Sequence, residues 1–195
     1  AQYVSLPFGA EEFEQRTSQR LLRSLGAVLP PDIRVYELYR APTGFSARFD
    51  ARARRYRYHL CSGPVGPLFC ANWSWWIRTA QPHALDANAM NEAARCLIGE
   101  HDFKSFCANR RMKKSTVRWI DEVRIGEHGT KIELLYTGNG FLYNMVRILT
   151  GTLLEIGSGM RRPEEMKEII EAKNRDMAGR TAPPEGLFLL HVDYE

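Results

Sequence analysis

Apolar residues recur at three- and four-residue intervals in four stretches of the chain, the spacing of an amphipathic helix. The clearest stretch is 142–156, whose apolar side runs to a glycine that ends the helix. Helices are also predicted from near Ala10 to the Pro30–Pro31 pair, from the N-cap candidate Asp86 into the 87–106 stretch, and after Pro163.

Strands are predicted where apolar and polar residues alternate. This pattern covers 32–42, about 47–61, a short WSWWI segment at 73–77, two strands joined by the GEHGT turn at 126–130, and 186–194. No GxGxxG turn follows a strand, which disfavours a doubly wound nucleotide-binding sheet. The order of elements predicts an α+β fold with a mostly antiparallel, mixed sheet flanked by helices.

Composition narrows the class of protein. The 195 residues are 44% hydrophobic, enough for one large domain or two small ones, and no apolar run reaches the length of a membrane span. A soluble, cytoplasmic protein without a membrane partner is therefore expected. The four cysteines form no CxxC pair and no metal-ligand spacing with histidine, so no metal site is predicted.

The net charge of +4 is modest, but its distribution is uneven. The stretch FSARFDARARRYRYHL, residues 45–60, holds five arginines and one acid between positions 48 and 57. Alternation along a strand places Arg54, Tyr56 and Tyr58 on one face and Arg55 on the other. A solvated strand with ordinary ion pairs would explain this pattern, but a second basic cluster, RRMKK at 110–114, favours RNA, because cations beside aromatic rings suit phosphates and unstacked bases.

Four motifs resemble the tRNA pseudouridine synthase A family, in the family's order and over residues 19–195. FSARFDARARRYRYHL is similar to its FxARFxAxxRxYxY strand, and EHDFKSF to its GxxDFxSF element. GNGFLYNMVRILTGTLLEIG resembles its buried NxFLxxMVR helix, and TAPPEGLFLLHVDY its closing strand. The resemblance implies a pseudouridine synthase fold, an isomerase that converts uridine to pseudouridine in the anticodon arm of tRNA, a homodimer bridged by tRNA, and no cofactor.

The resemblance also implies site residues. Tyr56 would stack on the flipped base, Leu187 would form an apolar wall, and Arg147, inside an apolar helix, would pair with the catalytic aspartate. From the residues alone, an ion pair of Arg147 with Glu155 is an equal alternative, and Leu187 is a core leucine. Basic residues in the strand and loop are candidates for phosphate contacts: Arg48, Arg54, Arg55, Arg110, Arg111, Lys113 and Lys114.

The family's aspartate lies in a GRTDxGVHA motif, and no Arg-Thr-Asp occurs in this sequence. We therefore expect the chain to be the C-terminal portion of a synthase, with residues 1–44 the rest of the N-terminal half-domain and 45–195 the C-terminal half-domain. Alone it is expected to be inactive. The alternatives are a non-catalytic tRNA-binding or RNA-folding module and a protein-interaction domain. Trp73 and Trp75 are assigned to the core or a subunit interface.

Overall fold

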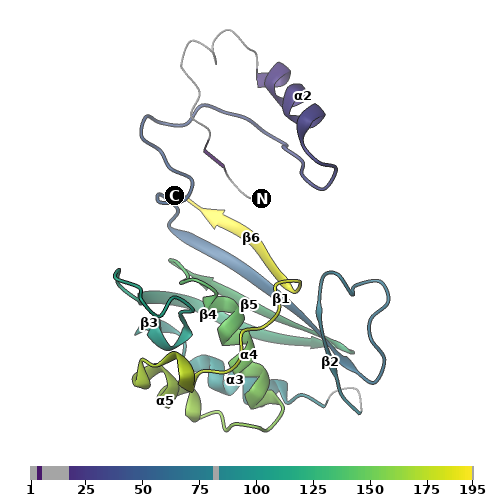
Figure 1. Ribbon diagram of the computed structural model, residues 1–195, viewed down its shortest axis with the longest axis vertical. Helices are drawn as coiled ribbons and strands as arrows, with labels where there is room; N and C mark the ends of the chain where they lie inside the picture. The colour runs from purple at the N-terminus through teal and green to yellow at the C-terminus, as the bar shows by residue number, and fades with distance from the viewer. Residues whose placement is uncertain (1–3, 6–17, 81–83, 195) are drawn as a thin grey trace. The chain divides into compact units, whose positions relative to one another are not determined.

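The computed structural model describes residues 4–5, 18–80 and 84–194. Contacts divide the chain into two compact units, residues 3–50 and residues 51–195. In the described part of the chain, every strand belongs to the larger unit, and the smaller unit holds helix α2 (Ser18–Val28) (Figure 1). The larger unit therefore carries the sheet on which a site can be built.

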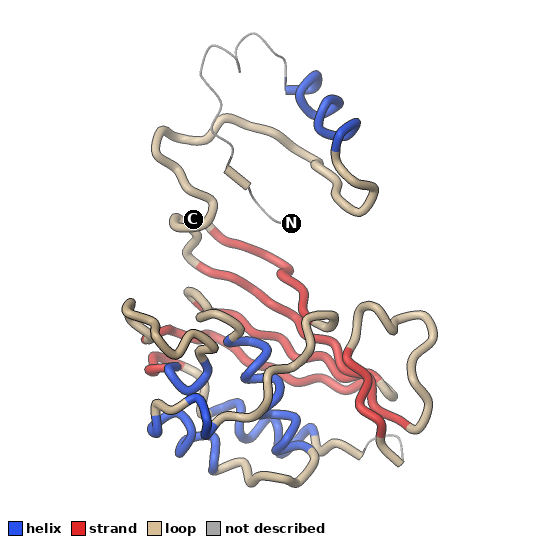
Figure 2. The backbone as a smooth tube through the Cα atoms, in the orientation of Figure 1, coloured by secondary structure: helices blue, strands red, loops and turns tan. Residues whose placement is uncertain are grey.

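The sheet has six strands: β1 (Ala53–Gly63), β2 (Trp75–Arg78), β3 (Gly99–Asp102), β4 (Val117–His128), β5 (Lys131–Gly138) and β6 (Leu187–Asp193). They are ordered β2-β1-β5-β4-β3. On the side of β1 away from β5, β6 pairs with the first half of β1 and β2 pairs with the second half. Only the β1–β2 pair is parallel; the others are antiparallel. Figure 2 shows the long strands running side by side. The predicted α+β fold with a mostly antiparallel mixed sheet is confirmed.

Three α-helices lie together against this sheet: α3 (Ala87–Arg95), α4 (Met145–Gly157) and α5 (Glu165–Ala172) (Figure 1). Asp86 caps α3 by accepting hydrogen bonds from the backbone of Asn88 and Ala89, as predicted. Helix α4 is buried on nearly all sides and lies at the centre of the apolar core. Two 3-10 turns, η1 (Phe103–Phe106) and η2 (Arg175–Met177), complete the unit.

Cross-strand pairs show which face of β1 is covered. Tyr56 lies opposite Tyr136, and Tyr58 lies opposite Leu134, so these four side chains share the face that packs on α4. The other face carries Arg57 and His59, whose side chains both lie within 4 Å of Glu133. Burial increases along β1 toward Gly63, which confirms that the strand runs from a charged surface into the core.

Three secondary-structure predictions need correction. Residues 32–42 are not a strand in the described part of the chain; all of their side chains except Leu38 are exposed, and Ile33 is 48% exposed, so the alternation does not separate a buried face from a solvent face. The strand predicted from about residue 47 begins only at Ala53, after a turn over 47–49. The helix predicted from Asp86 ends at Arg95, where the next three N–H groups bond the carbonyl three residues back instead of four. Gly99, with a left-handed φ of 97°, then begins β3.

Helix α2 ends at Val28, one residue before the bend that leads to Pro30 and Pro31, as predicted. Its predicted start near Ala10 lies outside the described residues. The hairpin is confirmed: β4 and β5 are joined by Gly129 and Thr130, where Gly129 has a φ of 62°.

Candidate functional site

Tyr56 lies on the helix-covered face of β1 and is half-buried. Its ring meets the edge of Phe141, with centroids 5.2 Å apart and ring planes at 84°. Burial raises the pKa of Tyr56, and the nearby Arg54 guanidinium opposes that rise. The phenol is therefore neutral near pH 7 and presents an aromatic surface fixed by Phe141.

Arg147 lies in the first turn of α4, between the buried Val146 and Ile148. Its Nε donates to the carbonyl oxygen of Ala182 at 2.6 Å, and its Nη1 donates to the side-chain oxygen of Asn144 at 3.1 Å. No carboxylate of the described residues forms an ion pair with it. Neutral oxygens therefore hold this half-buried guanidinium in place, and the described residues of the larger unit supply it with no ion pair.

The alternative partner considered for Arg147 is excluded. Glu155 lies at the other end of α4, where its carboxylate contacts Arg161 Nε at 2.7 Å and accepts the backbone N–H of Arg180. Both oxygens of Glu155 are thus used two turns away from Arg147 along the helix. The predicted alternative of an Arg147–Glu155 ion pair is wrong.

The segment from Ala178 to Gly186 connects η2 to β6 and holds the site together. The carbonyl of Ala182 accepts from Arg147, and the carbonyl of Pro183 accepts from the Tyr58 hydroxyl at 2.6 Å. Burial raises the pKa of Tyr58, which keeps that hydroxyl a donor. Leu187 follows directly, opposite Tyr58 across the β1–β6 pair and packed on the core. Tyr58, Arg147 and Leu187 are therefore all joined to one short backbone segment, and Tyr56 lies two residues before Tyr58 on the same face of β1. We call Tyr56, Arg147 and Leu187 the β1–α4 site.

A glycine in α4 makes this arrangement possible. A Cβ added at Gly151 would lie 1.8 Å from the carbonyl oxygen of Arg180, a separation that atoms cannot adopt. Without that Cβ, the 178–186 segment lies directly on the helix, and Gly179 N–H bonds Thr152 Oγ1 at 2.9 Å. Gly151 is therefore required for close approach of the two backbones, which sets the position of Ala182 beneath Arg147.

The basic residues of β1 divide between the two faces. Arg54 shares the face of Tyr56, and its Nη1 donates to the carbonyls of Ala51 at 2.9 Å and Asn139 at 2.7 Å. Arg55 is exposed on the opposite face. Arg48 is exposed in a turn of the smaller unit, 5.3 Å from the Phe49 ring centroid. Of the three, only Arg54 lies beside the β1–α4 site within the larger unit.

The basic loop, residues 110–114, connects η1 to β4. Lys113 and Lys114 are exposed and line a pocket of about 330 Å³ together with Lys104 and Arg110. Arg111 is also exposed, and its backbone N–H bonds Asn109 Oδ1 at 3.1 Å. The loop is joined to α4, because Ala108 N–H donates to the carbonyl of Tyr143, just before the helix. Four cations therefore lie at the surface near the N-terminal end of α4.

Neighbouring charges strengthen the positive potential. Arg118 is half-buried; burial lowers its pKa, and repulsion from Arg54 lowers it further. The two guanidinium groups lie close to Gly140: a Cβ added there would be 3.5 Å from Arg118 Nε and 3.9 Å from Arg54 Nη1. Two arginines thus approach each other next to Phe141, an arrangement that favours an anionic ligand.

The described residues contain no group of three or more histidine, cysteine, aspartate or glutamate side chains arranged to hold a metal ion. None of the helices in the described part of the chain has the length and hydropathy needed to cross a bilayer. What the geometry offers is an aromatic surface, a cation without a carboxylate partner and a basic rim, which together suit a nucleotide in RNA.

Comparison with known proteins identifies the family. A family model described as tRNA pseudouridine synthase matches residues 93–195, and the tRNA pseudouridine synthase A of Anoxybacillus flavithermus is 43% identical over 177 residues. The chain belongs to the tRNA pseudouridine synthase family. That alignment covers 91% of this chain and 70% of the relative. Two further relatives named tRNA pseudouridine synthase A are also similar. The Bacillus subtilis protein is 42% identical, over 91% of this chain and 70% of the relative. The Geobacillus kaustophilus protein is 41% identical, over 92% of this chain and 68% of the relative.

Family membership confirms the resemblance read from the four motifs. The residues that sequence reasoning missed are those that orient the family motifs: Phe141 against Tyr56, Asn139 under Arg54, and Arg175, which bonds the backbone of the 178–186 segment. Phe141 and Asn139 lie inside the GNGFLY motif, so the motif itself was the available signal. Nothing in the spacing of Arg175 indicated its partners.

Proposed function

We propose that this chain forms the base-binding part of a tRNA pseudouridine synthase that isomerises uridine in the anticodon stem-loop of tRNA. The observation that carries this proposal is the environment of Arg147. Among the described residues, its half-buried guanidinium has only neutral hydrogen-bond partners, and it belongs to the same site as Tyr56 and Leu187. A catalytic carboxylate placed against Arg147 would be held ionised and oriented. Family membership supports the reaction, since the relatives are named tRNA pseudouridine synthase A.

In the proposed mechanism, the target uridine leaves the RNA stack and its base is received by the β1–α4 site. Tyr56, steadied by Phe141, stacks on the base and replaces the lost stacking energy. Leu187 excludes water from one side. An aspartate supplied from outside these 195 residues forms a transient covalent bond to the nucleotide while the glycosidic bond between N1 of the base and C1′ of the sugar breaks. The base is then joined to C1′ through its C5, the C5 proton is lost, and the aspartate is released.

The RNA backbone is bound, in this proposal, by Arg48, Arg54, Arg55 and the basic loop cations Arg110, Arg111, Lys113 and Lys114. Support comes from the exposure of the loop and from its link to the start of α4 through Ala108 and Tyr143. Phosphate binding by lysine and arginine releases counterions, which makes affinity depend on salt. The proposal therefore predicts a measurable electrostatic signature.

Replacing the four loop cations by glutamine is expected to weaken tRNA binding and to flatten its salt dependence. The slope of log affinity against log salt should fall by about one unit for each phosphate that the variant no longer binds. The measurement is fluorescence anisotropy with labelled tRNA over a range of KCl concentrations. The control replaces four exposed cations of the same unit outside the loop: Arg95, Arg124, Arg162 and Lys167. Equal slopes for the two variants would contradict a specific role of the loop.

We also propose that the protein acts as a homodimer. The connection between β1 and β2 exposes several large apolar side chains, with Val65 and Leu68 83% exposed, Phe69 92% and Trp73 58%. Several large apolar side chains exposed on one connection favour an interface. Sedimentation velocity should show a dimer that dissociates in the Phe69→Ser, Trp73→Ser double variant and persists in Val28→Ser, which alters an exposed apolar residue elsewhere. A wild-type monomer at high micromolar concentration would remove this part of the proposal.

A further inference from the structure

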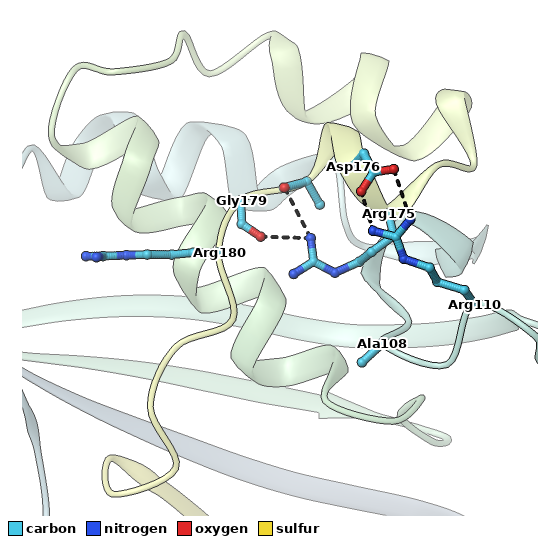
Figure 3. Close-up of a pocket in the computed structure, with 7 residues that line it drawn as sticks. Ala108, Arg110, Arg175, Asp176, Gly179 and Arg180 are labelled. Carbon is cyan, nitrogen blue, oxygen red and sulfur yellow. Dashed lines mark hydrogen bonds and ion pairs between the residues drawn. The ribbon is translucent and has the colours of Figure 1, made fainter.

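A second pocket of about 340 Å³ shares Arg110 with the first and borders the beginning of the 178–186 segment. It is lined by Ala108, Arg110, Arg175, Asp176, Ala178, Gly179 and Arg180, and we call it the arginine pocket (Figure 3). Its lining residues come from Ala108 and the basic loop, from η2 and from the beginning of the 178–186 segment. Arg180 contributes backbone only, because its guanidinium points away from the pocket and lies 4.5 Å from the Trp75 ring centroid.

Arg175 is held rigidly at the base of this pocket. Its Nη1 donates to the carbonyls of Ala178 at 3.2 Å and Gly179 at 3.0 Å, and its Nη2 donates to Thr181 Oγ1 at 3.1 Å. No hydrogen bond from its Nε is found among the described residues. A guanidinium fixed by neutral oxygens keeps its full charge and loses little further entropy when an anion arrives.

In this structure the carboxylate of Asp176 is the anion that pairs with Arg110 in the pocket. Both of its oxygens accept from Arg110, whose Nη1 reaches Oδ2 at 3.0 Å, in a two-pronged geometry (Figure 3). This pairing lowers the pKa of Asp176 and raises that of Arg110. Both side chains are more than 60% exposed, so the pair is open to exchange with another anion. A phosphodiester offers the same charge and the same two oxygens to a guanidinium.

We propose that the arginine pocket binds one phosphate group of the RNA backbone, and that Asp176 is an internal competitor which holds Arg110 until RNA displaces it. This inference rests on the proposed function for the identity of its ligand. Arg110 would turn from the carboxylate to the phosphate, while the fixed Arg175 supplies the second cation. The pocket adjoins the start of α4 through the Ala108–Tyr143 hydrogen bond, so the bound phosphate belongs to RNA entering the β1–α4 site.

The electrostatics of the pocket agree with this assignment. Burial lowers the pKa of Arg175, and the proximity of Arg110 lowers it further, with only Asp176 and Glu155 opposing the effect. Two guanidinium groups thus repel each other around a single exposed carboxylate. A phosphate bound between them reduces that repulsion, which is why an anion is favoured at this place rather than a neutral ligand.

The test is Asp176→Asn, a substitution of nearly equal size that removes the competitor. We expect tRNA affinity at low salt to increase about threefold to fivefold and the salt slope to steepen by up to about one unit, measured by fluorescence anisotropy. A gain of affinity cannot result from misfolding. The control is Glu122→Gln, which also removes one carboxylate paired with an arginine, Arg124, outside the pocket.

A double-mutant cycle separates this mechanism from a general change of net charge. In an Arg110→Gln background, Asp176→Asn should no longer increase affinity, because the cation that it would release is absent. An equal gain with and without Arg110, or the same gain in Glu122→Gln, would overturn the proposal.

Free phosphate and RNA are distinguished by a second arm. If inorganic phosphate at constant ionic strength raises the melting temperature of Asp176→Asn while its tRNA affinity stays at the wild-type value, the pocket binds a small phosphate compound and the RNA assignment is wrong. The proposed function is tested separately. A chain that gains tRNA affinity on Asp176→Asn but forms no pseudouridine when the carboxylate is supplied contradicts the reaction and leaves the pocket supported.

Discussion

The 195-residue chain alone is expected to form no pseudouridine in tRNA, and activity should appear when a polypeptide carrying the Gly-Arg-Thr-Asp motif is added in trans. The expected difference is at least about 10³-fold, because loss of a nucleophile removes the covalent step. The measurement is mass spectrometry of nucleosides from an unmodified tRNA transcript after incubation with each combination of polypeptides.

The structural reason is that several carboxylates of the larger unit are engaged elsewhere. Asp86 caps α3, and Asp102 contacts Thr116 and Lys173. Asp121 accepts from the Trp119 indole, and Asp193 contacts His191. Within the described residues of the larger unit, no acid is paired with Arg147.

Two controls make this result decisive. The added polypeptide with asparagine in place of its aspartate should leave tRNA binding intact and give no activity. Arg147→Gln in the 195-residue chain should abolish the restored activity, because the supplied carboxylate would lose the cation that orients it. Pseudouridine formed by residues 1–195 without any addition would show that the chain has its own nucleophile and would contradict the proposed role of Arg147.

Gly151→Ala is expected to destabilise the larger unit by about 3 kcal/mol or more, which corresponds to a fall in melting temperature of roughly 10 °C. The added methyl group would lie 1.8 Å from the carbonyl oxygen of Arg180, so either α4 or the 178–186 segment must move. Any such movement displaces Ala182, the hydrogen-bond acceptor of Arg147. Thermal unfolding followed by circular dichroism is the measurement.

The matched control is Gly126→Ala in β4, where the nearest atom to the new Cβ is the His128 Nε2 at 3.9 Å. Its stability should stay within about 0.5 kcal/mol of the wild type, because the site is open and alanine is no worse than glycine in a strand. Equal melting temperatures for Gly151→Ala and wild type would show that the 178–186 segment does not rest on α4 in solution.

Much of the fold was predictable because local patterns and tertiary packing agree. The 142–156 periodicity predicted the central helix, and the GEHGT turn predicted the β4–β5 hairpin. Prediction failed where packing partners decide the outcome. Residues 32–42 alternate like a strand, but all of their side chains except Leu38 are exposed, so no core covers one face of the stretch and the alternation does not mark a strand. β3 was missed because it has only four residues and is defined by its pairing with β4.

The sequence by itself determined the family, the helix that carries Arg147, and the segregation of Tyr56 and Arg55 to opposite faces of β1, because ordered motifs and the two-residue period of a strand are local properties. The tertiary structure alone decided the contacts of Arg147. It excluded Glu155, supplied Ala182 and Asn144 instead, and brought Arg110 to Asp176 across 66 positions of sequence. Such contacts depend on how closely two backbone segments approach each other at residues like Gly151, and the spacing of residues along the sequence does not determine that distance.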